Sequence, residues 1–232
     1  TNGNERGVAT PRDHESILYY DNIDFGGFGS DIIHIPIFEL ENEKLAFEIW
    51  EGRPYTEGAE KLADAVYDKP SVWNTYQEET FRLAKRLTGY TGIGFVFTRK
   101  AHIKGFYFER MNKAYEKLYA RDSAGIYGDA YKMQGEAVTG IGNNVTFTYD
   151  NMDFGDAGAG TIRICGRTGL EKNTIHVRFI KDGLTISRIV EFERCDEYTE
   201  RVFDIDGVSG ECEVLLIFLP GSNFDLKWFQ FE

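Results

Sequence analysis

Nearly the same eight-residue stretch occurs twice in this chain of 232 residues. YYDNIDFG fills residues 19–26 and TYDNMDFG fills residues 148–155, which lie 129 positions apart. If the residues around both copies repeat as well, the chain holds two related domains rather than one. The flanking sequence therefore decides the domain count and the fold class.

Further blocks repeat in the same order. Ile33 and Ile35 match Ile162 and Ile164 at the same offset. Later pairs, at offsets of 122 or 123, are Tyr76 with Tyr198, Phe81 with Phe203, Leu83 with Ile205, Phe106 with Phe229, and Phe108 with Phe231. The first copy thus holds about six extra residues, which we place within residues 51–70. Two copies are too few for a solenoid, so each is predicted to fold alone.

Most repeated blocks alternate apolar and polar residues, which is typical of strands with one buried face. Glycine-containing turn signals separate the blocks. This pattern predicts an all-β fold with two tandem β-sandwich or jelly-roll domains, residues 1–110 and 111–232. Two segments, residues 56–67 and 112–122, instead carry apolar residues at helical spacing.

Charge limits the partners. The net charge is −12 and the isoelectric point is about 4.9, so the chain repels nucleic acid and anionic membranes but not neutral ligands. No apolar run reaches the length of about 18 residues that a membrane span needs. The three cysteines match no metal motif and are predicted to be free thiols. Free thiols indicate a reducing compartment, and we expect a cytoplasmic protein.

No catalytic residue stands out. The 38 acidic residues form pairs everywhere by chance, and none is singled out as a glycosidase pair. The four histidines show no metal-binding spacing. We therefore predict no catalytic residue, no metal and no cofactor. Asp21 and Asp150, which precede Asn in the repeated octamer, are expected to cap a turn, with ligand contact as the alternative.

Aromatic and amide side chains near predicted loops are the remaining candidates. Proteins that bind sugars stack aromatic rings on the C–H face and direct Asn, Asp or Arg at the hydroxyl groups. The candidates of the first domain are Trp73, Asn74 and Tyr76, and those of the second are Tyr127, Tyr198, Asn223 and Asp225. The alternative for each ring is packing in a sandwich core.

Long segments of the chain resemble a known family. The ending VLLIFLPGSNFDLKWFQFE resembles the last strands of family 6 carbohydrate-binding modules. Four segments resemble the C-terminal region of bacterial glycoside hydrolase family 2 β-galactosidases, namely TPRDHESILYYDNIDFG, DKPSVWNTYQEETFRL, HIKGFYFER and YGDAYKMQGEAVTGIGNNVTFTYDNMDFG. The resemblance implies two tandem galactose-binding-like modules that are not themselves enzymes. Their expected partners are a β-galactoside or a plant or dietary oligosaccharide, and the catalytic domains of the parent enzyme.

The same resemblance assigns residues. Asp225 falls where the modules carry a ligand-contacting Asn, and His102 falls there in the first domain. Lys227 falls where they carry a calcium-binding Asp, so no calcium is expected at that place. Cys195 is the counterpart of Trp73, so the two domains are expected to differ. The alternative function is a purely structural or oligomerisation role without sugar binding.

Overall fold

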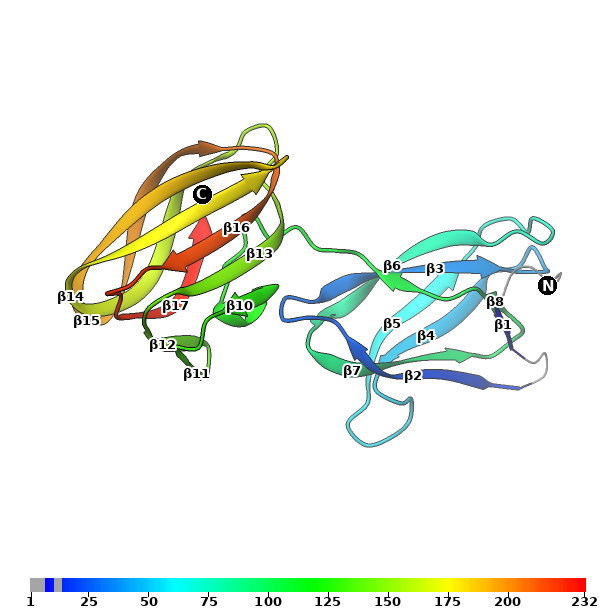
Figure 1. Cartoon of the computed structure of the whole chain (residues 1–232). Coiled ribbons are helices and arrows are strands. Elements are labelled where there is room, and N and C mark those ends of the chain that lie inside the picture. Colours follow the sequence, from blue (N-terminus) through cyan, green and yellow to red (C-terminus); the bar gives the residue numbers. More distant parts are fainter. Residues whose placement is uncertain (1–6, 11–13) are drawn as a thin grey trace. The chain divides into compact units, whose positions relative to one another are not determined.

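The computed structural model describes residues 7–10 and 14–232, and nearly all of them lie in strands and tight turns (Figure 1). It divides into two compact units, Thr1–Arg110 (unit 1) and Met111–Glu232 (unit 2). The predicted all-β fold is confirmed. Within the described residues, no helix has the length and apolarity to cross a membrane.

Unit 1 is a sandwich of two sheets. Its strands are β1 (Val8–Ala9), β2 (Ser16–Asp24), β3 (Ser30–Phe38), β4 (Leu45–Glu51), β5 (Glu60–Tyr67), β6 (Gln77–Leu87), β7 (Tyr90–Phe97), β8 (His102–Ile103) and β9 (Tyr107–Phe108). One sheet has the order β1-β8-β3-β6 with β9 also on β3, and the other has the order β2-β7-β4-β5. The core lies between them, because alternate residues of both sheets are buried in one cluster.

Unit 2 repeats this architecture with longer strands. Its elements are a 3-10 helix η1 (Ala120–Asp122), β10 (Gly125–Tyr127), β11 (Lys132–Gln134), β12 (Ala137–Ile141), β13 (Val145–Asp153), β14 (Ala159–Lys181), β15 (Leu184–Val208), β16 (Glu211–Phe218) and β17 (Phe224–Phe231). The strand order is β10-β13-β16-β14-β17-β12-β11, and β15 pairs with β14.

The hairpin of β14 and β15 connects the two layers of unit 2. Residues 162–168 of β14 pair with β17, whereas residues 175–180 pair with β16. Between these stretches, the pairing of β14 with β15 is irregular from Gly166 to Lys172. A bulged ladder bends and twists, so the hairpin turns from one layer to the other at this point. We call this place the corner of unit 2.

Strand pairing supports the sequence repeat. In unit 1, Ile33 lies opposite Phe108. In unit 2, Ile162 lies opposite Phe231. These are the residues matched at offsets of 129 and 123, so the two units share one register as well as one order of strands.

The repeated octamer forms the same bulge in both units. Asn22 and Asn151 have positive φ angles of 54° and 55°, and strand pairing shifts register around each of them. Asn tolerates this left-handed conformation better than most residues. Two residues later an Asp caps the following turn, through Gly26 N to Asp24 Oδ1 and Gly155 N to Asp153 Oδ1, both 2.9 Å.

The capping role expected for Asp21 and Asp150 stays a prediction, since the turn-capping bonds described above come from Asp24 and Asp153. Asp21 accepts a hydrogen bond from the Tyr19 hydroxyl, and Asp150 pairs with Lys113. Both side chains are thus held by neighbouring side chains.

The helical spacing noted for residues 56–67 and 112–122 does not produce α-helices. Residues 60–67 form β5, because Leu62, Ala65 and Tyr67 are buried when the segment pairs with β4. Only Ala120–Asp122 of the second segment is helical. The backbone of Leu118 instead exchanges two hydrogen bonds with Phe229, of 2.8 and 2.9 Å.

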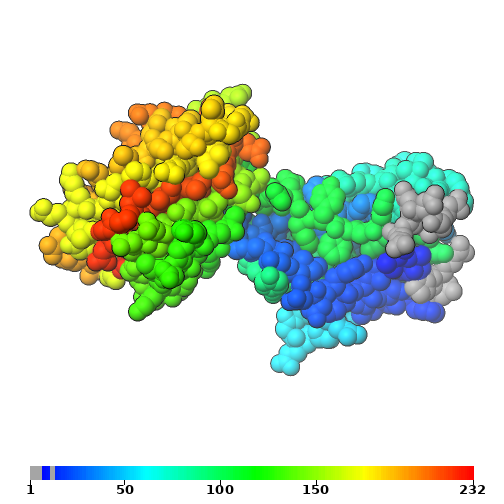
Figure 2. Space-filling view, in the orientation of Figure 1, coloured from blue at the N-terminus to red at the C-terminus, as the bar shows by residue number. Residues whose placement is uncertain are grey.

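The extra residues of unit 1 lie in one loop. Residues 52–59 connect β4 to β5, whereas only Asp182 and Gly183 connect the matching strands β14 and β15. The loop is six residues longer than its counterpart and projects from unit 1 (Figures 1 and 2). It lies within the predicted range of 51–70.

Candidate functional site

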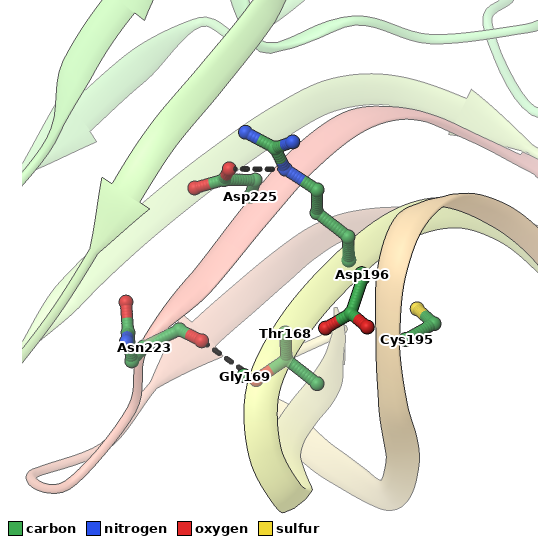
Figure 3. Close-up of a pocket in the computed structure, with 7 residues that line it drawn as sticks. Thr168, Gly169, Cys195, Asp196, Asn223 and Asp225 are labelled. Carbon is green, nitrogen blue, oxygen red and sulfur yellow. Dashed lines mark hydrogen bonds and ion pairs between the residues drawn. The ribbon is translucent and has the colours of Figure 1, made fainter.

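A cavity of about 240 Å³ lies at the corner of unit 2 (Figure 3). Its walls come from the irregular part of β14, the facing part of β15 and the start of β17. The lining residues are Arg167, Thr168, Gly169, Cys195, Asp196, Asn223 and Asp225. We call this cavity the corner pocket. Asn223 and Asp225 were predicted from the sequence, whereas the other five were not.

An ion pair forms one side of the corner pocket. Arg167 Nε donates to Asp225 Oδ2 at 2.7 Å, and the backbone N–H of Gly140 donates to Asp225 Oδ1, also at 2.7 Å. The bond to Asp225 raises the pKa of the Arg167 guanidinium, which stays charged. Both oxygens of Asp225 are thus held by the protein itself.

Tyr198 lies beneath this ion pair. The guanidinium carbon of Arg167 is 4.9 Å from the centre of the Tyr198 ring, a distance typical of a cation–π contact. Burial raises the pKa of the Tyr198 hydroxyl, followed in effect by the charge of Asp225. Arg167 therefore covers a face of the ring that the sequence predicted would stack on a sugar.

The backbone of Asn223 is fixed on the opposite side. Its carbonyl accepts a bond of 2.7 Å from the Thr168 hydroxyl, and its N–H donates to Asn173 Oδ1 at 2.9 Å. Within the described part of the chain, the side-chain amide of Asn223 bonds to no other residue. That amide is therefore available to a ligand as both donor and acceptor.

Asp196 and Cys195 complete the wall. Asp196 is exposed, and none of the residues described by the structure pairs with its carboxylate. The half-buried Cys195 thiol lies 3.7 Å from the carbonyl oxygen of Gly166. The corner pocket therefore offers a free carboxylate and a free amide.

The matching place in unit 1 is aromatic. Phe38 lies opposite His102 on β3 and β8, just as Arg167 lies opposite Asp225 on β14 and β17. The offsets of the repeat, 129 and 123, relate these pairs. An ion pair in unit 2 thus replaces two rings in unit 1.

Three predicted residues of unit 1 gather around Phe38. The centre of the Phe38 ring lies 6.3 Å from Trp73, 6.1 Å from Tyr76 and 5.3 Å from His102. Trp73 is 78% exposed, although it contacts this cluster edge-on. Its neighbour Asn74 is also exposed and has a positive φ of 56°. We call this group the aromatic corner.

His102 lies below the surface of the aromatic corner. Its side chain is buried, and both ring nitrogens lack a hydrogen-bond partner among the described residues. Burial lowers the pKa of His102, and the charge of Lys100 lowers it further. The ring is therefore neutral near pH 7, and it packs against Phe38 beneath the exposed residues.

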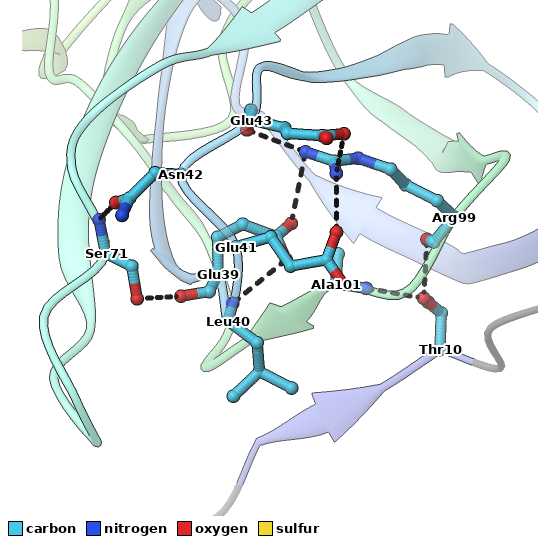
Figure 4. Close-up of polar contacts among 9 residues, drawn as sticks. All are labelled: Thr10, Glu39, Leu40, Glu41, Asn42, Glu43, Ser71, Arg99 and Ala101. Carbon is cyan, nitrogen blue, oxygen red and sulfur yellow. Dashed lines mark hydrogen bonds and ion pairs between the residues drawn. The ribbon is translucent and has the colours of Figure 1, made fainter.

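A polar network holds the loops of the aromatic corner (Figure 4). Arg99 reaches Glu39 at 3.8 Å and Glu43 at 3.5 Å. The Ser71 hydroxyl donates to the carbonyl oxygen of Glu39 at 2.7 Å, and the Ser71 backbone N–H donates to Asn42 Oδ1 at 2.8 Å. Because Glu39 follows Phe38 and Ser71 precedes Trp73, the network fixes the loops that carry both rings.

Tyr127 lies apart from these sites. It is 74% exposed on β10, opposite Thr146. A second cavity of unit 2, of about 430 Å³, is lined by residues 129–132, 139 and 140, but not by Tyr127. The described residues contain no group of three or more His, Cys, Asp and Glu side chains placed to hold a metal.

Comparison with known proteins gives the following relatives. No protein-family model matches the chain. It is 25% identical over 251 residues to an endo-1,4-beta-xylanase A of Thermoclostridium stercorarium, covering 100% of this chain and 46% of the xylanase. A second endo-1,4-beta-xylanase A of that organism is 26% identical, covering 69% of this chain and 27% of the xylanase. The chain therefore spans less than half the length of these curated relatives.

Two solved structures are also similar to part of this chain. One is the module CsCBM6-3 from Clostridium stercorarium with cellobiose, at 25% identity, a TM-score of 0.45, and coverage of 51% of this chain and 94% of the module. Another is a family 6 carbohydrate-binding module from Clostridium cellulolyticum with xylose, at 25% identity, a TM-score of 0.45, and coverage of 51% and 98%. The chain is similar to family 6 carbohydrate-binding modules. Its resemblance to the C-terminal region of β-galactosidases stays a prediction.

Proposed function

We propose that the chain consists of two non-catalytic modules that bind carbohydrate and belong to a larger glycoside hydrolase. The observation that carries the proposal is that each unit has its candidate site at the same place in the repeat. The exposed Trp73 of unit 1 and the corner pocket of unit 2 both surround the paired positions 38/102 and 167/225. Both places combine ring or guanidinium planes with amide groups, as sugar sites do.

Two independent arguments suggest two classes of sugar. The resemblance to β-galactosidases favours a β-galactoside, and the whole-chain similarity to an endo-1,4-beta-xylanase supports xylo-oligosaccharides. Galactosides, xylo-oligosaccharides and cello-oligosaccharides are therefore the ligands to compare. The parent activity, a β-galactosidase as the resemblance suggests or a xylanase, is part of the same proposal.

The test is calorimetric titration of the full chain, with NMR to locate the shifted residues. We expect at least one sugar class to bind at micromolar to millimolar concentration. Trp73→Ala should weaken binding at unit 1 roughly tenfold or more, because stacking removes about 60 Å² or more of apolar ring surface from water. Tyr90→Ala is the matched control, since Tyr90 is 69% exposed and begins β7 at the end away from Arg99. Silence of both units toward every sugar at millimolar concentration would reject the proposal.

A second function has one observation in its favour. Among the described residues, β15 pairs only with β14, and it carries Leu184 and Ile189 at 72% and 62% exposure. An exposed apolar edge strand is a place where another chain or domain adds. A structural or oligomerisation role predicts concentration-dependent association in light scattering, and Ile189→Lys should abolish it.

A further inference from the structure

The corner pocket has a charge that its hydrogen bonds do not neutralise. Arg167 and Asp225 offset each other through their 2.7 Å bond. Asp225 is also held by Gly140, so its carboxylate is fixed in the wall. Asp196 has no partner within the described residues, and no second cation lines the cavity. One negative charge therefore remains.

The corner pocket offers a ligand both hydrogen-bond donors and a carboxylate acceptor, whereas a simple anion site offers donors alone. Within the described residues, Arg167 uses only its Nε in a hydrogen bond, so its terminal nitrogens and the Asn223 amide are open to a ligand. These donors suit hydroxyl oxygens. Asp196 suits hydroxyl hydrogens, because an ionised carboxylate only accepts. A neutral polyol satisfies both sets at once, whereas the carboxylate group of a uronic acid can only accept and so satisfies only the donors.

We propose that the corner pocket selects neutral sugars and rejects uronic acids, and that Asp196 is the residue responsible. The inference rests on the proposed function, because it names the sugar class that this pocket takes. In a cavity of about 240 Å³ that Asp196 lines, a uronate carboxylate would stay closer to Asp196 than the Debye length of about 10 Å at 0.1 M salt. At that separation like charges repel appreciably even in a medium close to water. We expect a uronate to bind about fivefold or more weakly than the matching neutral sugar at low salt.

Cys195 provides a reporter for this one pocket. Cys195 is half-buried and is one of the residues that line the cavity, whereas Cys165 and Cys212 are buried. Burial raises the pKa of Cys165, and it raises the pKa of Cys212 to about 11. Thiolates are the reactive form, so a neutral alkylating reagent should modify Cys195 first. A sugar in the corner pocket should slow that reaction.

The experiment measures alkylation of Cys195 by iodoacetamide in the full chain, by mass spectrometry of the tryptic peptides. Methyl β-galactoside and methyl β-galacturonate are compared over a range of concentrations, at low and high salt. We expect the neutral sugar to protect at several-fold lower concentration. The difference should shrink at high salt and in Asp196→Asn. It should persist in Asp182→Asn, which removes an equal charge from the turn between β14 and β15.

Three results would count against this reasoning. Equal or better protection by the uronate in the unaltered chain overturns the charge selection alone. A difference that survives in Asp196→Asn overturns the role of Asp196. If neither sugar protects Cys195 although unit 1 binds sugar by NMR, carbohydrate binding at the corner pocket is overturned and the inference with it.

Discussion

Beneath its corner, each unit packs one large and one small residue at two matching core positions, and the large residue is at opposite positions in the two units. In unit 1 the positions are Ile37 and Ala101, both fully buried. The repeat offsets place Gly166 and Phe224 there in unit 2. A Cβ on Gly166 would lie 2.2 Å from Cζ of Phe224, whereas carbon atoms in contact stay about 3.5–4.0 Å apart. The aromatic ring thus occupies the space that a side chain at 166 would need.

Gly166→Ala should therefore destabilise unit 2. The ring of Phe224 would have to move by more than 1 Å (~1.3 Å from the van der Waals distance), but it is fully buried and packs on Phe192 at 5.1 Å and Phe218 at 5.7 Å. Overpacking of this kind costs about 1–3 kcal/mol. For a unit of this size that corresponds to a fall in melting temperature of about 4–12 °C.

Gly160→Ala is the matched control for this prediction. Gly160 is on the same strand, and a Cβ there would meet nothing within 4 Å. Neither glycine has a positive φ, so the two variants differ in space rather than in backbone strain. Phe224→Leu should cost about 1 kcal/mol or more by itself. Combined with Gly166→Ala it should cost less than the sum, with a coupling of about 1 kcal/mol.

Hydrogen exchange measured by mass spectrometry is the appropriate assay, because peptides report each unit separately. We expect faster exchange in the peptides of unit 2 for Gly166→Ala and no change in those of unit 1. Equal exchange in Gly166→Ala and Gly160→Ala would refute the argument, as would strict additivity with Phe224→Leu.

Two further predictions concern the corners. His102 has a lowered pKa when folded, so the unfolded chain takes up a proton first and stability should fall as the pH drops below about 6.5. His102→Leu should remove that part of the slope and keep or raise stability at pH 7 by about 1 kcal/mol, since the ring nitrogens bond to no described residue. Denaturant unfolding from pH 5 to 8 tests this, and parallel curves for the two proteins would contradict it. Cys195→Trp should give the corner pocket the ring that Trp73 supplies in unit 1 and tighten sugar binding by several-fold; calorimetry that finds no gain over Cys195→Ala would contradict this.

Much of the fold followed from the sequence because alternation along a strand is a local property. Ile33 and Ile162 could be matched before the structure was known, and their strand partners match as well. The helical reading of residues 56–67 failed for a physical reason. Apolar residues there fit both periods, and pairing with β4 buries Tyr67, which the helical pattern did not use.

The site was harder to predict because it depends on long-range contacts. Asn223 and Asp225 were candidates from the sequence and line the corner pocket. Arg167 lies 58 residues from Asp225, and no local pattern connects them. One signal was available, since Arg167 stands at the offset of Phe38 where the repeat changes from a ring to a charge. Asp196 carries no signal of its own and becomes notable only when its neighbours are known.

The placement of β17 has a consequence for how unit 2 is made. This strand lies between β12 and β14, in the middle of its layer, although it is the last strand of the chain described here. The ribosome covers the most recently added residues, so the layer stays open until Phe231 has emerged. Until then, β12 and β14 expose unpaired backbone on facing edges. A pause in translation just before β17 should therefore leave unit 2 prone to aggregate, although most of its strands have already been synthesised.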